Sequence, residues 1–189
     1  WSWGQGVPKG SVIEKFLTPC NGSAITVQSG TYTVQTVSAL QDLTTSHVDI
    51  TGSVIDYTPP AGTQTVIYEF NFHQNWTDSN TIAHYSLWLD NDSGTPTEVT
   101  NFRTTQGAEG GAYLGLRSQF VWAFHIGGSD NDATGRRDTW TSARTIKITG
   151  REYSGSFDTR VHCTGHFHDS SGTNTNAFSQ PLIGITALA

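Results

Sequence analysis

Residues 52–72 read GSVIDYTPPAGTQTVIYEFNF, a short apolar segment that runs into a proline corner and out into a longer alternating segment. Pro59 and Pro60 fix their own backbone and offer no N–H to a sheet, so the first segment must end there. Gly62 can adopt a backbone angle that other residues avoid, which predicts that it is the turn residue. The second segment has the period of a strand over Gln64–Asn75, with one face formed by Val66, Tyr68, Phe70 and Phe72.

The same alternation recurs along the chain, and no segment has a helical period. Turn-forming runs of Gly, Ser, Asn and Asp separate the segments. We predict an all-β fold, a single antiparallel β-sandwich of the jelly-roll type over residues 11–189, preceded by an N-terminal arm or connection over residues 1–10. The other expected strands are Ser11–Leu17, Ala24–Val37, Val48–Tyr57, Ile82–Leu89, Glu98–Thr104, Ala112–Ile126, Arg144–Glu152, Asp158–His168 and Pro181–Leu188.

The length, charge and apolar content of the chain exclude some classes of function. The chain has 189 residues, enough for one domain with a full core, and charged residues make up 14% of it. Its net charge of −6 argues against nucleic acid as a partner, because nucleic-acid binding needs clustered Lys and Arg. No apolar run approaches the length of a membrane-spanning helix, so we expect no membrane insertion.

Two segments predict self-association. Ala112–Ile126 carries large apolar side chains on both faces, which indicates a strand that is covered twice or lies at a subunit interface. Pro181–Leu188 is also apolar, and an exposed apolar terminal strand would favour aggregation. We therefore expect an oligomer that buries Ile183 and Ile185 against neighbouring copies.

The cysteines allow two interpretations. Cys20 and Cys163 could form a disulfide between an early loop and a late strand, which would imply an oxidising or extracellular setting. The alternative is two buried free thiols, because Cys is among the most often buried residues.

A late histidine cluster is the best candidate for a metal site. On a strand, His162, His166 and His168 share one face, and the last two are close enough for both imidazoles to reach one ion. The alternative is a polar solvent face opposite Val161 and Cys163. The runs Asp90–Gly94 and Asp130–Asp132 resemble parts of calcium loops, but Asn and Asp in tight turns explain them equally well.

Loop aromatic and charged residues form the candidate binding set. Trp76 precedes Asp78, and Trp140 follows Arg136 and Arg137, so both indoles are expected in polar loops. An aromatic side chain in a loop, surrounded by polar groups, can stack on a sugar ring, although aromatic residues in β-sandwiches belong mostly to the core. The basic pair could also contact Asp130, Asp132 and Asp138 or an acidic neighbouring subunit.

The order of these features resembles jelly-roll domains of marine bacteriophages and large aquatic viruses. It consists of the opening Pro8-Lys9-Gly10, the Ser29–Tyr32 turn, the proline corner, the Val66–Phe70 strand and the apolar C-terminal strand. Such domains are similar in build to the trimeric globular heads of the tumour necrosis factor and complement families. The resemblance implies a homotrimeric fibre, spike or capsid-surface protein that contacts other virion proteins, and it supplies no catalytic residues.

Three functions follow as hypotheses. The first is a non-enzymatic virion structural protein at the particle surface, acting in assembly or host attachment without a cofactor. The second is a secreted or cell-surface carbohydrate-binding module that recognises a host-surface glycan. The third is a metal-dependent enzyme that uses the late histidines. We favour the first because no phosphate loop, nucleophile elbow or zincin helix motif is present.

Overall fold

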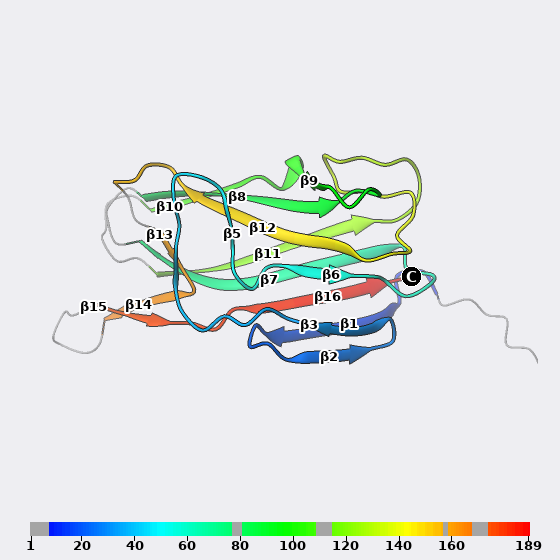
Figure 1. The fold of residues 1–189 in the computed structure, drawn as a ribbon, viewed down its shortest axis with the longest axis horizontal. Helices are drawn as coiled ribbons and strands as arrows, with labels where there is room; N and C mark the ends of the chain where they lie inside the picture. Colours follow the sequence, from blue (N-terminus) through cyan, green and yellow to red (C-terminus); the bar gives the residue numbers. More distant parts are fainter. Residues whose placement is uncertain (1–7, 77–80, 109–114, 157–158, 168–173) are drawn as a thin grey trace, which may run out of the picture.

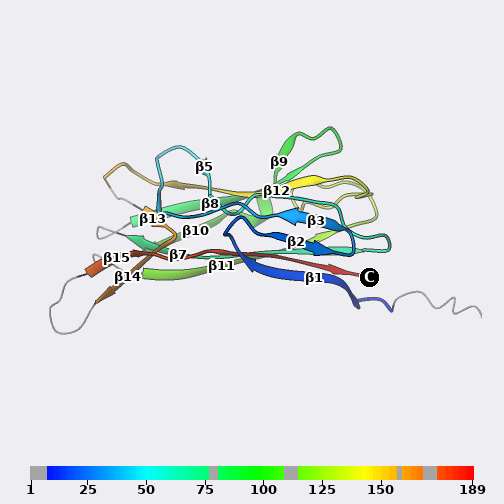
Figure 2. The ribbon, with the colours of Figure 1, turned by 60° about the horizontal axis from the view of Figure 1, so that its bottom comes forward.

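Two antiparallel sheets pack face to face in the computed structural model, which describes residues 8–76, 81–108, 115–156, 159–167 and 174–189 (Figures 1 and 2). No helix among these residues is long and apolar enough to cross a membrane. The predicted all-β sandwich is therefore confirmed.

The first sheet is built around its central strand. It comprises β1 (Val12–Pro19), β16 (Leu182–Leu188), β7 (Thr65–Trp76), β11 (Gly115–His125), β13 (Thr159–Val161) and β4 (Gln41–Asp42). Along one edge β7 pairs with β11, and along the other it pairs first with β16 and then with β13.

The second sheet has two long central strands, β8 and β12, with shorter strands at both edges. It comprises β10 (Thr104–Ala108), β9 (Pro96–Glu98), β8 (Thr81–Asp90), β12 (Arg144–Glu152), β5 (Val48–Asp49) and β6 (Ile55–Tyr57). Two hairpins complete the fold, β2 (Ala24–Val27) with β3 (Gly30–Thr33), and β14 (Cys163–Phe167) with β15 (Asn174–Phe178).

The proline corner carries the chain from one sheet to the other. Strand β6 ends at Tyr57 in the second sheet, and β7 begins at Thr65 in the first. Gly62 has a φ of +89°, and Thr63 donates to the carbonyl of Pro60 from its amide (3.2 Å) and its hydroxyl (2.7 Å). Both sequence predictions for this corner, the turn at Gly62 and the break before β7, are confirmed.

Alternating residues from both sheets form the core. The predicted face of β7 is buried, and it packs against apolar residues of β8 and β12 such as Leu87 and Ile148. Aromatic contacts run through this layer, including Phe72 with Tyr85 and with Phe120 at ring-centroid distances of 5.8 and 5.4 Å. Burial of this apolar area is the main stabilising contribution.

The apolar C-terminal strand is an internal element rather than an interface. Strand β16 lies between β1 and β7, and Ile183 and Ile185 point into the core of the same chain. The expectation that these two residues are buried against neighbouring copies is wrong, because the core of the same chain already covers their side chains. The outward-facing positions of β16 are Leu182, Gly184, Thr186 and Leu188.

Five strand assignments also differ. Ala24–Val37 forms the β2–β3 hairpin instead of one strand, and Val48–Tyr57 is broken between β5 and β6. Glu98–Thr104 is broken by a 3₁₀ turn, η1 (Thr100–Phe102), between β9 and β10. Asp158–His168 is broken at His162, whose φ of +60° ends β13 before β14 begins. Strand β15 lies in a region that was not predicted as a strand.

A buried carboxylate ties the β2–β3 hairpin to the core. Glu14 of β1 accepts hydrogen bonds from the Ser29 amide (2.7 Å), the Ser29 hydroxyl (2.6 Å) and the Tyr57 hydroxyl (2.7 Å). The hydroxyl of Tyr32 donates to the Thr58 carbonyl at 2.8 Å, close to the proline corner. A buried charge persists only where several donors compensate its lost hydration.

We predict that Glu14→Gln lowers the free energy of unfolding by about 1–3 kcal/mol, because an amide cannot accept from all three donors. The measurement is urea denaturation. Glu69→Gln on the outer face of β7 is the matched control, with an expected change within about 0.5 kcal/mol. Equal effects of the two substitutions would contradict the role given to Glu14.

Candidate functional site

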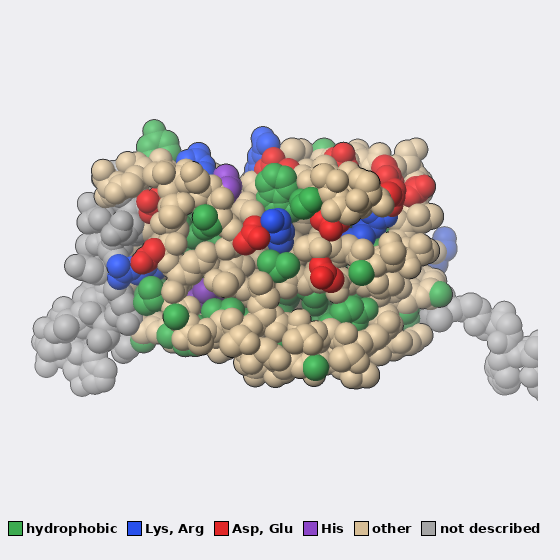
Figure 3. All heavy atoms as spheres, viewed as in Figure 1, with side chains coloured by type: hydrophobic (Ala, Val, Ile, Leu, Met, Phe, Trp, Pro, Cys, Tyr) green, Lys and Arg blue, Asp and Glu red, His purple; other side chains and the backbone are tan. Residues whose placement is uncertain are grey.

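A polar depression lies on the outer face of the second sheet. Its volume is about 490 Å³, and it is lined by His47, His84, Tyr85, Ser86, Trp88, Glu98, Arg103, Thr104, Thr105 and Arg151. Figure 3 shows a hollow at the upper edge of the molecule, with basic side chains on either side and a histidine at its base. This volume falls within the range of about 300–1,000 Å³ that is typical of small-ligand sites.

Strand alternation brings these side chains together. On β8, Tyr85, Leu87 and Leu89 face the core, so the intervening His84, Ser86 and Trp88 face outward. The sheet register places three residues side by side across three strands, Thr105 of β10, His84 of β8 and Arg151 of β12. Two positions along, Ser86 lies beside Thr149, and beyond it Trp88 lies between Glu98 and Lys147.

Hydrogen bonds fix the two histidine rings. Thr149 Oγ1 accepts from Trp88 Nε1 at 2.9 Å and lies 3.1 Å from His47 Nδ1. Thr105 Oγ1 lies 2.9 Å from His84 Nδ1. Each ring therefore uses its Nδ1 within the protein and keeps Nε2 for another partner.

One ion pair forms the opposite wall. Arg103 binds Glu98 with both ends of its guanidinium, Nε to Oε1 at 2.9 Å and Nη2 to Oε2 at 2.6 Å. Ser86 Oγ donates to the same carboxylate at 2.7 Å. These bonds, the one from Arg103 foremost, lower the pKa of Glu98 to about 2. Glu98 is thus ionised, and Arg103 compensates its charge.

Burial lowers the pKa of both histidines, and Arg151 lowers it further. Among the described residues, no carboxylate forms an ion pair with Arg151, whose Nη1 donates only to the backbone carbonyl of Glu152 at 3.3 Å. The depression therefore combines one uncompensated cation with two histidines that resist protonation while it is unfilled.

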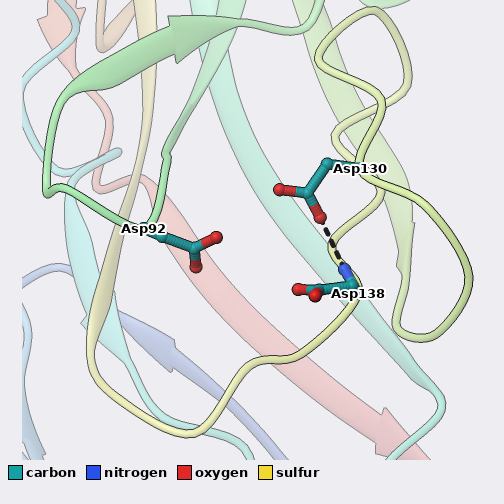
Figure 4. A group of neighbouring side chains, drawn as sticks. All are labelled: Asp92, Asp130 and Asp138. Atoms are coloured by element: carbon teal, nitrogen blue, oxygen red, sulfur yellow. Dashed lines mark hydrogen bonds between the residues drawn. The ribbon is translucent and has the colours of Figure 1, made fainter.

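A second cluster joins the two runs that resemble calcium loops. Asp92, from the turn after β8, faces Asp130 and Asp138 of the β11–β12 connection, and their carboxylate oxygens lie within 4.8 Å of one another (Figure 4). The Asp130 carboxylate accepts from the amide of Asp138 at 2.6 Å. The Arg144 guanidinium pairs with Asp92.

Local hydrogen bonds shape the two loops that bring these carboxylates together. Asp138 accepts from the amide and hydroxyl of the next residue. In the other loop, Asn91 Oδ1 accepts from the amides of Ser93 and Thr95 at 3.0 and 2.9 Å, and its bond to Ser93, two residues on, is that of an Asx turn. The structure thus shows the turn bonds of one interpretation, and calcium binding by these runs stays a prediction.

The predicted histidine cluster is divided by the structure. His162 is fully buried, with its ring against Phe70 and Phe72, rather than on a strand face shared with His166. Its positive φ interrupts the alternation from which a common face was inferred. The side chain of His166 and the whole of His168 lie outside the described residues, so metal binding there stays a prediction.

The cysteines are two buried free thiols, which is the second of the two interpretations that the sequence allowed. Cys20 Sγ contacts the carbonyl of Gly52 at 3.3 Å, and burial raises the pKa of its thiol to about 12. Cys163 begins β14 and its thiol pKa is also raised by burial.

The predicted binding set does not assemble. Trp76 is buried at the end of β7, whereas Trp140 is buried near the start of that strand, with its Nε1 donating to the Tyr57 carbonyl at 3.0 Å. Trp140 packs on Phe124, which pairs with Val66, so the two indoles lie roughly 30 Å apart along the strand. Trp76 therefore ends a strand instead of lying in a loop, whereas Trp140 lies in the β11–β12 connection, as expected, but is buried.

Arg136 and Arg137 lie in different environments. Arg137 is buried and pairs with Asp132 at 2.8 Å, one of the acidic partners considered from the sequence. Arg136 is exposed, and Asp78 lies outside the described residues.

Sequence reasoning missed the depression because its residues come from four separate segments without a motif. A usable signal was the outward-facing His84–Ser86–Trp88 alternation on a confidently assigned strand. Which polar residues of other strands would lie beside it depends on strand pairing, which a single sequence does not specify.

No protein-family model and no curated protein matches this sequence. Among solved structures, that of infectious bursal disease virus, Gx strain, matches with 7% identity and a TM-score of 0.33, covering 92% of this chain and 39% of that chain. The crystal structure of the VP2 subviral particle of the same virus matches with 10% identity and a TM-score of 0.24, covering 89% and 47%. This chain thus spans less than half of those virus chains, and similarity this low does not establish a shared function.

We predict that His162 makes the protein less stable in acid. Burial lowers its pKa from 6.5 to about 4. Between these values the unfolded chain binds a proton that the folded chain excludes, so stability falls as the pH drops through that window.

The measurement is urea denaturation at pH 7 and pH 5. Wild type should lose about 2 kcal/mol more than His162→Asn, because the variant has no proton to bind and Asn tolerates a positive φ. His125→Asn, at an exposed position on β11, should keep the wild-type loss. A His162→Asn variant with the full wild-type loss would disprove this assignment.

Proposed function

We propose that this protein is a non-enzymatic structural component of a virion, displayed at the particle surface, where it forms a homotrimer and takes part in assembly or host attachment. The viral setting is supported by the sequence resemblance centred on the proline corner. The observation that carries the self-association is the outer face of the first sheet over β1, β16 and the neighbouring parts of β7 and β11 (Figure 2). At one end of this sheet, β14 contacts β7 and β11.

This face exposes apolar side chains in register. Leu17 of β1 lies across from Gly184 of β16, which pairs with Glu69 of β7, which pairs with Val121 of β11. Leu17 is 49% exposed and Val121 50%. A Cβ added at Gly184 would lie 2.9 Å from the Leu17 side chain, so Leu17 packs directly against this glycine.

Few charges interrupt the centre of this face. Glu69 Oε1 accepts from Asn71 Nδ2 at 2.9 Å and from Gln119 Nε2 at 3.0 Å. These two bonds hold the carboxylate against neighbouring side chains of the sheet. The neighbouring row consists of Lys15, Thr186, Ile67 and Ala123, and its single cation lies on β1, at the edge of the sheet. A flat, weakly charged sheet face with exposed aliphatic groups suits burial against symmetry-related copies.

The second candidate function is a carbohydrate-binding module of a secreted or cell-surface protein, and the depression over β8 and β12 favours it. The two functions predict different amounts of the chain in purified virus particles. Stoichiometric copies of the chain in purified particles would support the virion protein, whereas absence from particles together with glycan binding would support the module.

We predict that the chain has a solution mass of three times 20.5 kDa by size-exclusion chromatography with light scattering. Val121→Lys should dissociate the trimer, because each copy would bury an unpaired charge. The isolated subunit should keep its stability within about 0.5 kcal/mol, since residue 121 is half exposed.

Tyr153→Lys is the matched control, because Tyr153 is an exposed aromatic, 61% accessible, that follows β12 of the second sheet. It should leave the trimer intact. A monomeric wild type, or equal dissociation by both substitutions, would refute self-association through the first sheet.

A further inference from the structure

The depression over β8 and β12 is positively charged in an acidic protein. The net charge of the chain is −6, yet the cation of Arg151 has no carboxylate in an ion pair among the described residues, and the Arg103–Glu98 pair contributes no net charge. His47 and His84 add two groups that can each gain a proton. An anionic group is therefore the ligand that this surface favours.

The hydrogen-bond pattern allows both imidazoles to act as donors. Thr149 Oγ1 accepts from Trp88 Nε1, and its hydroxyl proton can donate to His47 Nδ1, in which case the imidazole proton is on Nε2. Thr105 can donate to His84 Nδ1 in the same way. Each Nε2–H can then bind an oxyanion even when the histidine is neutral.

The volume and lining of the depression favour a ligand larger than a free ion. Ser86 is a small buried residue that lies between His84 and Trp88 along β8. The protein surface is therefore lower at Ser86 than at these two larger side chains. The resulting volume of about 490 Å³ is much larger than a sulfate or a carboxylate needs. The partly exposed indole of Trp88 offers an apolar wall, and Thr104 and Thr105 offer hydroxyl groups.

We propose that this depression binds an acidic sugar, a saccharide that carries a carboxylate or a sulfate group. The oxyanion pairs with Arg151 and accepts from His47 and His84. The sugar ring lies against Trp88, and its hydroxyls bond to the threonines of β10. This assignment does not depend on a viral role or on trimer formation.

Binding of an anion is linked to protonation of the histidines. The groups that shift the pKa of these histidines or contact them are Arg151, Arg103, Glu98, Thr105, Thr149 and the ring of Tyr153, and His84 also lowers the pKa of His47. Among these only Glu98 favours the protonated form of His47. A bound oxyanion adds negative charge beside both rings and raises their pKa. Affinity therefore increases as the pH falls from 7.5 to 5.5.

The test is isothermal titration calorimetry of the full chain with three ligands that share one body: lactose, 3′-sialyllactose and 3′-sulfolactose. Both acidic ligands should bind at least about tenfold more tightly than lactose, and more tightly at pH 5.5 than at pH 7.5. The tighter of the two identifies the anion as carboxylate or sulfate. Equal affinity for lactose and both acidic ligands, or no binding of any, would overturn the proposal.

Two variants locate the site. Arg151→Gln should weaken acidic-ligand binding by about tenfold, whereas Arg136→Gln, which removes an exposed arginine outside the depression, should change it less than about twofold. Equal losses in both variants would show a non-specific charge effect and contradict the site. Sodium sulfate that displaces 3′-sialyllactose at equal concentration would show that the sugar ring contributes nothing and would contradict the sugar assignment.

Discussion

The pairing of β7 along both of its edges is the constraint on which the first sheet depends. The proline corner ends β6 in the second sheet and sets where β7 begins in the first. From that point, alternation sends Val66, Tyr68, Phe70 and Phe72 into the core. A shift by one residue would expose all four, so the registers of β11 and β16 against β7 are strongly fixed.

The same alternation determines both outer surfaces, which differ in chemistry. On the first sheet, outward positions include Leu17, Ile67 and Val121 and few charges, which suits contact with other copies of the chain. On the second sheet, outward positions include His84, Trp88 and Arg151, which surround a depression. The sandwich thus has the proposed association surface on one side and the proposed ligand-binding surface on the other, an arrangement compatible with assembly and attachment in a single domain.

Sequence alone predicted the elements whose pattern is local. The alternation of β7, β8 and β12 and the chemistry of the proline corner gave these segments nearly their observed bounds. Three predictions were wrong for local physical reasons. Phe102 belongs to a 3₁₀ turn and not to a strand, and His162 adopts a positive φ. Ile183 is apolar because β16 lies inside a sheet of its own chain and not between subunits.

The site was harder to predict than the fold. Trp76 and Trp140 are followed or preceded by polar residues in the sequence, yet both indoles complete the core at opposite ends of the sandwich. The depression depends on which strands lie beside β8, and β10 and β12 reach it from 20 and 60 or more residues away along the chain. Long-range pairing of this kind leaves no trace in a single sequence.

In the proposed assembly, other copies of the chain cover the first sheet while the second sheet remains accessible. Hydroxyl-radical footprinting, read by mass spectrometry over a dilution series, measures the exposure of individual side chains directly. We predict that Leu17 and Val121 are protected at high concentration and become reactive on dilution, while Trp88 and Tyr153 react equally throughout. Concentration-dependent protection of Trp88 and Tyr153, with Leu17 and Val121 unchanged, would contradict it.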